Sequence, residues 1–127
     1  MLELVNAEFA ADQYRRAKKE LAGDFFGFGY AREWPRACGG SVDIDSGPIV
    51  PFLDASAAAS GMAVLGAAVF DDAPYLENLL RSLNLMAFPT EESGRLSYQA
   101  SNPVGDAVLL YAMVEGPLWE KVRGGHD

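Results

Sequence analysis

The segment between Gly23 and Leu53 constrains the fold more than any other part of the chain. It shows no helical period, and its glycines and prolines are dense enough to end regular structure repeatedly. Connections of this length are uncommon in compact domains and are usually disordered or functional. Because five aromatic residues lie between Phe25 and Trp34, we expect an ordered, functional loop with short strand pieces near residues 41–44.

Helical periodicity is found on both sides of this loop. Apolar residues spaced three and four apart predict helices over residues 2–22, 55–70, 73–87 and 102–115. The second and third helices follow one another closely, which favours a helical hairpin. A polar, hairpin-like link over residues 90–101 includes a short strand. We therefore expect an all-α fold, a single helical domain over residues 1–127, built of antiparallel helical hairpins with a long ordered loop and a short β-like link.

Composition and charge exclude several classes of protein. The formal net charge of -8 disfavours nucleic-acid binding, because an acidic surface repels phosphate backbones. The single cysteine excludes an intrachain disulfide and a multi-cysteine zinc site, and we expect neither a metal nor another cofactor. The uncharged stretch over residues 55–70 is too short to span a bilayer, and the first twenty residues lack the basic start and apolar core that are typical of a signal peptide. We therefore expect a cytoplasmic protein without a membrane span.

Aromatic and charged residues are interleaved in the first part of the loop. Aromatic walls with a few placed charges are typical of a pocket for a small molecule. We expect Tyr30, Arg32 and Trp34 to line a substrate cleft. The alternative is that these aromatic side chains fill the core beneath a long loop.

Two carboxylates, Asp43 and Asp45, form the sharpest short motif. If their segment is extended, side chains two residues apart point the same way. Like charges held close together raise the pKa of one of them, which suits general acid–base catalysis. Glu33 is then the third catalytic candidate, facing the pair across a cleft. The alternatives are turn formation by Asp45 before Gly47 and a structural ion pair between Arg32 and Glu33.

Three further residues, Tyr98, Asn102 and Asp106, surround the start of the last predicted helix and complete the set of substrate-lining candidates. Asp106 has an alternative role, because a carboxylate in a first helical turn interacts favourably with the helix dipole. Cys38 is not expected to act as a nucleophile. The one histidine that could serve as its base, His126, lies in the terminal tail.

The segments GFGYAREWPRACGGSVDIDSGPIVPF and ASNPVGDAVLLYAMVEGPLW resemble the C-terminal part of bacterial proteins built as (α/α) toroids. The similar groups are the linalool dehydratase/isomerase-like and the six-hairpin glycosidase-like proteins. The resemblance covers most of residues 9–120 and rests on three motifs: Arg32-Glu33-Trp34-Pro35, Asp43-x-Asp45-Ser46-Gly47-Pro48 and Ser101-Asn102-Pro103-x-Gly105-Asp106. It implies helical hairpins around a central cavity and hydrolase or lyase chemistry on sugars or terpenoids by acidic residues. A toroid needs more hairpins than this chain holds, so the resemblance implies a piece of a longer parent.

Two functions from different classes remain open. The first is part of a hydrolase or lyase, with a small-molecule ligand and carboxylate acid–base chemistry. The second is a non-enzymatic helical interaction module. The helices over residues 55–70 and 102–115 carry more apolar surface than a layer of two hairpins can cover, and exposed apolar surface favours association. We therefore expect a homo-oligomer, or contact with the missing remainder of a toroid.

Overall fold

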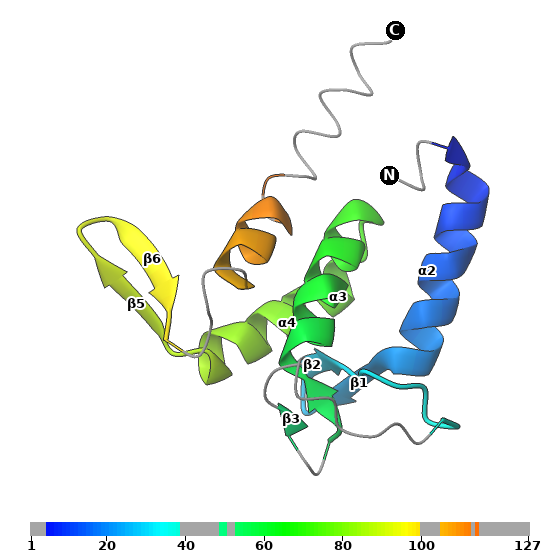
Figure 1. The fold of residues 1–127 in the computed structure, drawn as a ribbon, viewed down its shortest axis with the longest axis horizontal. Coiled ribbons are helices and arrows are strands. Elements are labelled where there is room, and N and C mark those ends of the chain that lie inside the picture. Colours follow the sequence, from blue (N-terminus) through cyan, green and yellow to red (C-terminus); the bar gives the residue numbers. More distant parts are fainter. Residues whose placement is uncertain (1–4, 39–48, 51–52, 100–104, 113, 115–127) are drawn as a thin grey trace, which may run out of the picture.

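The computed structural model describes residues 5–38, 49–50, 53–99, 105–112 and 114. In chain order the elements are helix α2 (Ala7–Leu21), strands β1 (Ala22–Phe25), β2 (Phe28–Ala31), β3 (Ile49–Val50) and β4 (Ala55–Ser56), helices α3 (Ala57–Val69) and α4 (Ala73–Met86), and strands β5 (Pro89–Glu92) and β6 (Arg95–Tyr98). Residues 105–112 and 114 are also helical. Figure 1 shows α3 and α4 in the middle, with α2 on one side and the β5–β6 hairpin on the other.

The expected all-α fold is wrong. Within the described residues the strands pair as three two-stranded antiparallel sheets, β1 with β2, β3 with β4, and β5 with β6. The fold therefore mixes helices with β-hairpins and is not built of helical hairpins alone. The helices expected over residues 2–22, 55–70 and 73–87 correspond to α2, α3 and α4.

The turn between β1 and β2 shows why the sequence does not predict this hairpin. Phe26 and Gly27 connect the two strands with φ angles of 53° and 81°. Positive φ at both central positions is typical of a type I′ turn, whose twist matches that of the strands it joins. Asp24 accepts a hydrogen bond from the backbone N–H of Gly27 at 3.2 Å. Because a bulky residue such as Phe rarely adopts positive φ, Phe-Gly is not a turn signal in a sequence. The strand pieces expected near residues 41–44 lie outside the described residues.

The second hairpin confirms the expected β-like link. Ser93 and Gly94 have φ angles of 54° and 77° and join β5 to β6, with Glu92 opposite Arg95. Serine followed by glycine is a more usual pair for such a turn than phenylalanine followed by glycine. Of the β1–β2 and β5–β6 hairpins, the β5–β6 hairpin carries the more typical turn sequence.

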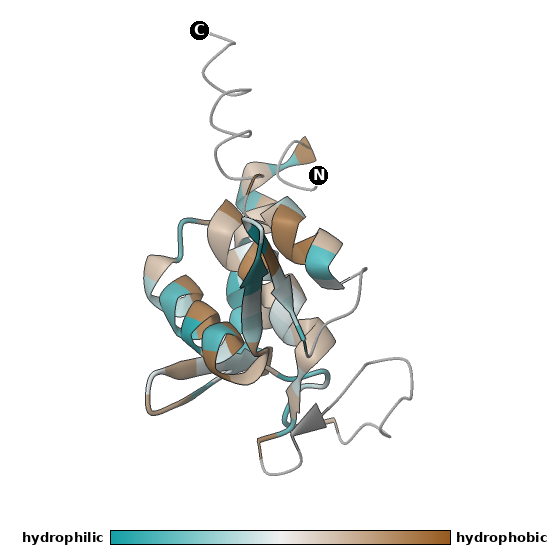
Figure 2. Ribbon diagram, turned by 90° about the vertical axis from the view of Figure 1, so that its left-hand side faces the viewer, coloured by the Kyte–Doolittle hydropathy of each residue, from teal (hydrophilic) through white to brown (hydrophobic). Residues whose placement is uncertain are grey.

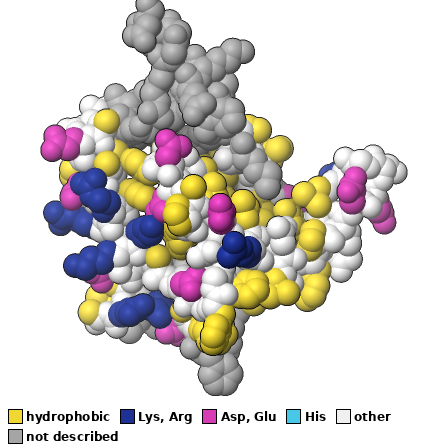
Figure 3. All heavy atoms as spheres, turned by 180° about the vertical axis from the view of Figure 1, so that it is seen from behind, with side chains coloured by type: hydrophobic (Ala, Val, Ile, Leu, Met, Phe, Trp, Pro, Cys, Tyr) yellow, Lys and Arg dark blue, Asp and Glu magenta, His cyan; other side chains and the backbone are white. Residues whose placement is uncertain are grey.

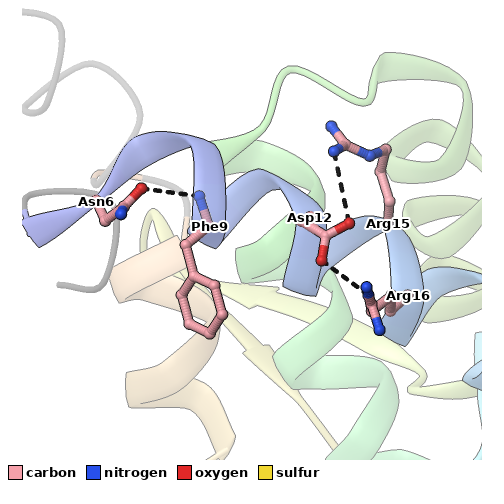
Figure 4. Close-up of polar contacts among 5 residues, drawn as sticks. All are labelled: Asn6, Phe9, Asp12, Arg15 and Arg16. Atoms are coloured by element: carbon pink, nitrogen blue, oxygen red, sulfur yellow. Dashed lines mark hydrogen bonds and ion pairs between the residues drawn. The ribbon is translucent and has the colours of Figure 1, made fainter.

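Local side-chain contacts fix where two helices begin. Asn6 caps α2, because its side-chain oxygen accepts a hydrogen bond from the backbone N–H of Phe9 at 2.9 Å (Figure 4). One turn further on, Asp12 pairs with Arg16 at 2.7 Å and with Arg15 at 3.8 Å. Ser56 caps α3 in the same way, accepting from the N–H of Ala59 at 3.2 Å. Ser and Asn are favoured at this position because they satisfy an amide that has no partner within the helix.

The core lies where α3, α4 and the C-terminal helix meet. It contains Val64 and Ala67 of α3, Tyr75 and Leu79 of α4, and Ala112. Hydrophilic and hydrophobic residues alternate along α4 (Figure 2), so that one side of the helix packs inward.

The β2 strand lies directly on α4, and a glycine permits this contact. A Cβ atom at Gly29 would lie 2.9 Å from both the Cβ of Asn78 and the backbone nitrogen of Leu79. Any side chain at this position would therefore separate the strand from the helix. The β1–β2 hairpin is in this way fixed against the central helix.

No helix among the described residues combines the length and the apolar character that crossing a bilayer requires.

Candidate functional site

A groove with a volume of about 410 Å³ lies between α2 and α3. Side chains of these two helices form its walls, and further lining residues come from the end of the β1–β2 hairpin and from α4. Seen from behind, Lys and Arg side chains gather over α2, and hydrophobic side chains are exposed beside them (Figure 3).

The α3 wall consists mainly of small residues. Residues four apart on a helix share a face, and the wall follows this spacing, with Ala58, Met62 and Gly66 in one row and Ala59 and Ala63 in the next. Small side chains leave space between the helices, and they offer a ligand almost no hydrogen-bonding groups. The wall is therefore apolar along most of its length.

The α2 wall is also one face of a helix, with Tyr14, Ala17, Lys18 and Leu21 spaced three and four apart. Tyr14 lies directly against α3, because a Cβ atom at Gly66 would lie 3.2 Å from its Cε2 atom. Its ring also stacks on Phe70, with 4.7 Å between the ring centres. These contacts narrow the groove near the C-terminal end of α3.

A polar cluster lies next to this narrow end. The Tyr14 hydroxyl donates a hydrogen bond to Asp72 Oδ2 at 2.7 Å, and the Lys18 ammonium donates to the same oxygen. Lys18 Nζ also lies 5.2 Å from the centre of the Tyr75 ring. The Tyr75 hydroxyl donates to the backbone oxygen of Tyr30 at 2.9 Å. These four side chains connect α2 to α4 and to the β1–β2 hairpin.

The two tyrosines and Asp72 of this cluster have shifted pKa values. Burial, together with the hydrogen bond to Asp72, raises the pKa of Tyr14 above its ordinary value. Burial and the charge of Asp72 raise the pKa of Tyr75 to about 12. Burial acts to raise the pKa of Asp72, but the hydrogen bonds from Lys18 and Tyr14 outweigh it and lower that pKa. A neutral tyrosine pair around an ionised carboxylate is a structural connection and is poorly suited to proton transfer near pH 7.

The other end of the groove carries Arg32 and Glu33. Arg32 follows β2 and forms an isolated bridge with Ala55, immediately before α3. Its Nε atom donates to the backbone oxygen of Leu53 at 3.4 Å, and its guanidinium carbon lies 5.9 Å from the centre of the Tyr30 ring. Its Nη1 atom is buried and makes no hydrogen bond to the described residues.

The two ends are well separated. Arg32 contacts residues before the first turn of α3, whereas Tyr14 contacts Gly66 near its last turn. Ala58 and Gly66 lie about 12 Å apart along the helix, because each residue advances the axis by about 1.5 Å. The groove is thus an apolar channel with a guanidinium at one end and aromatic rings at the other.

The sequence-predicted residues fall in different places. Arg32 and Glu33 line the groove. Tyr30 lies next to it, with its ring beneath Arg32 and directly against Gly23. Trp34 is 48% exposed and is not among the described residues that line the groove. Cys38 is exposed.

The remaining candidates lie away from the groove or outside the described residues. Tyr98 is buried on β6. Asp106 lies in the C-terminal helix, where its Oδ1 atom is buried without a hydrogen bond to the described residues. Neither lines the groove. Asp43, Asp45 and Asn102 lie outside the described residues, so their expected roles stay predictions.

Sequence reasoning missed the cluster of Tyr14, Lys18, Asp72 and Tyr75. Tyr14 and Lys18 are four residues apart on a helix, which indicates a shared face. No pattern in the sequence connects them to Asp72, which lies 58 residues after Tyr14. Only the packing of α2 beside the α3–α4 junction brings them together.

Comparison with known proteins finds no matching family model and no similar curated protein. The resemblance to (α/α)-toroid enzymes therefore stays a prediction. Within the described ranges, no three His, Cys, Asp or Glu side chains lie close enough together to hold a metal ion.

Proposed function

We propose that this chain binds a small, mainly apolar molecule in the groove between α2 and α3. The observation that carries this proposal is the groove itself, with its volume of about 410 Å³ and its walls of Ala, Leu and Met. Pockets for small molecules typically have volumes of about 300–1,000 Å³ and predominantly apolar walls with a few polar groups. Transfer of apolar surface from water into such a groove is favourable.

The lining favours one of the two substrate classes that the resemblance to (α/α) toroids implies. A sugar presents hydroxyl groups on all sides and needs many hydrogen-bonding partners. The α3 wall offers Ala58, Ala59 and Ala63, which have none. A terpenoid-like hydrocarbon fits these walls better, because it loses no hydrogen bonds when it leaves water.

Glu33 gives this binding proposal a chemical extension. Its carboxylate lines the groove, and a carboxylate beside a bound substrate is a candidate general acid or base. In a longer parent protein, Glu33 would be one acid–base group of a hydrolase or lyase. This is the catalytic role that the sequence predicts for Glu33.

Titration calorimetry with octanol tests the binding proposal. Ala59→Phe places a ring in the groove and should weaken octanol binding by about tenfold or more, which corresponds to about 1.4 kcal/mol. Ala57→Phe is the matched control, because Ala57 is exposed on the same helix and does not line the groove. Equal octanol affinity in the two variants, or no binding to the unaltered chain, would contradict the proposal.

A second function, self-association, is favoured by a different observation. Several large apolar side chains are exposed where α4 passes into β5: Leu85, Met86 and Phe88, with Leu96 on β6. Exposed apolar side chains in such number often mark a contact with another protein. This is the interaction-module alternative, with a second copy of the chain as the partner.

Light scattering over a concentration series tests this alternative. A dimer that Phe88→Ser and Leu85→Ser shift towards monomer supports it. A monomer at all concentrations contradicts it. Val5→Ser is a suitable control, because Val5 is 83% exposed at the other side of the molecule, before α2.

A further inference from the structure

We propose that the molecule bound in the α2–α3 groove carries a carboxylate at one end, held by Arg32. This inference rests on the proposed function and adds the polar group that orients the ligand. The class of ligand is an apolar chain with a terminal carboxylate.

The argument begins with the Nη1 atom of Arg32. It is buried, it makes no hydrogen bond to the described residues, and its side chain lines the groove. A guanidinium is always charged in proteins, and a buried donor without a partner is unfavourable. A carboxylate that enters the groove would supply that partner through a charge-assisted hydrogen bond.

The rest of the Arg32 side chain is already fixed. Its Nε atom donates to the backbone oxygen of Leu53 at 3.4 Å, and its guanidinium lies over the Tyr30 ring. Its backbone N–H donates to the oxygen of Leu21 at 2.9 Å. A guanidinium held in this way loses little further freedom when it binds an anion, which favours binding.

The first turn of α3 adds positive potential at the same end. Ser56, Ala58 and Ala59 line the groove there. The N-terminus of a helix carries a partial positive charge that attracts anions. Arg32 and this helix terminus therefore act in the same direction on a carboxylate.

The opposite end of the groove suits the apolar part of the ligand. Lys18 lines that end, but its ammonium is engaged with Asp72, whose side chain is 14% exposed. The ring of Tyr14 and Gly66 both line this end of the groove and lie against one another. A hydrocarbon chain that extends from Arg32 along the alanine face of α3 would end against the Tyr14 ring.

Glu33 lines the same groove and carries the opposite charge to Arg32. The two residues therefore predict opposite preferences for the charge of the ligand. Its carboxylate repels an anionic ligand and attracts a cationic one. Three ligands with the same chain and different head groups separate the possibilities: octanoate, octanol and octylamine. If Arg32 holds the head group, octanoate binds about tenfold more tightly than octanol, and octylamine binds most weakly.

Two substitutions then test the assignment by titration calorimetry. Arg32→Gln should reduce octanoate affinity by about tenfold and leave octanol affinity within about twofold. Glu33→Gln should have the opposite effect on octanoate and tighten its binding. Arg36→Gln is the matched control, since Arg36 is an exposed cation nearby that does not line the groove.

Octanol serves as an internal measure of folding in every variant. If Arg32→Gln abolishes octanol binding as well, Arg32→Lys replaces it, because lysine keeps the charge and loses the planar donor array. A reduced preference for octanoate in Arg32→Lys, with intact octanol binding, then supports the assignment to the guanidinium, and an unchanged preference contradicts it. Equal affinities for octanoate and octanol in the unaltered chain overturn this inference and leave the proposed function standing. Preference for octylamine overturns it in favour of Glu33. Absence of binding by all three ligands overturns the proposed function itself.

Discussion

The hydroxyl of Tyr14 lies 2.7 Å from Asp72 Oδ2, although 58 residues separate the two along the chain. This contact fixes α2 beside the junction of α3 and α4, and so it determines the width of the groove at its narrow end. Lys18, one turn further along α2, donates a hydrogen bond to the same oxygen of Asp72.

Removal of the Tyr14 hydroxyl should destabilise the protein. Tyr14→Phe keeps the stacking on Phe70 and loses a hydrogen bond to a charged acceptor, so we expect a loss of about 1–3 kcal/mol in the free energy of unfolding. Urea denaturation measures it. In a double-mutant cycle with Asp72→Ala, the two losses should be less than additive, because both substitutions remove one interaction. Strict additivity would show that the contact does not contribute to stability.

Asp72 should make stability depend on pH on the acid side. Its pKa is lower in the folded chain than the ordinary value of 3.8. The unfolded chain therefore binds more protons in this range, so the stability contribution is present above the ordinary pKa and is lost as the pH falls through the folded pKa. Denaturation at a series of pH values below 5 should show this fall, and Asp72→Asn should reduce its slope. The neighbouring substitution Asp71→Asn, at an exposed residue, should leave the slope in place.

Tyr75 should produce a corresponding effect in alkali. Its ordinary pKa is 10.0, and burial with the charge of Asp72 raises it to about 12. The unfolded chain loses this proton first, so the contribution is complete below pH 10 and is lost as the pH rises through about 12. Tyr75→Phe should reduce this alkaline decrease without abolishing it, because the pKa of Tyr14 is raised as well. If the stability of Tyr75→Phe falls by the same amount in alkali, the decrease comes from another group.

Two glycines should respond in opposite ways to alanine. Gly29→Ala places a Cβ atom 2.9 Å from the Leu79 backbone nitrogen, so the strand and α4 must move apart. We expect a loss of about 1–3 kcal/mol in the free energy of unfolding. Gly61→Ala, inside α3 with no atom within 4 Å of the new Cβ, should stabilise by about 0.5–1 kcal/mol. Thermal denaturation of both variants checks the pair, and equal effects would contradict the packing of β2 on α4.

The helices were predictable because each carries its own signal. The apolar face of α2, the leucine stripe of α4 and the small residues of α3 all repeat with helical spacing. The β1–β2 hairpin was not predictable, because its turn places Phe26 at a φ of 53°. Bulky residues rarely adopt such a φ, so the sequence gives no signal for this turn.

Only part of the candidate site was predictable from the sequence. Arg32 and Glu33 stood out as charges among aromatic residues, and both line the groove. The aromatic neighbours Tyr30 and Trp34 were expected to form its walls, yet the alanines of α3 do so. A wall of small residues carries no chemical signature in a sequence, because alanine is common in every helix.

The direct passage of α2 into β1 has a mechanical consequence. Ala22 is both the residue that ends the helix and the first residue of the strand, and no flexible linker absorbs motion between them. A tilt of α2 therefore also tilts the β1–β2 ribbon, and the ribbon is seated on α4 through Gly29. Widening of the groove is thereby coupled to slippage of a strand on a helix, which makes the groove stiff at its Arg32 end.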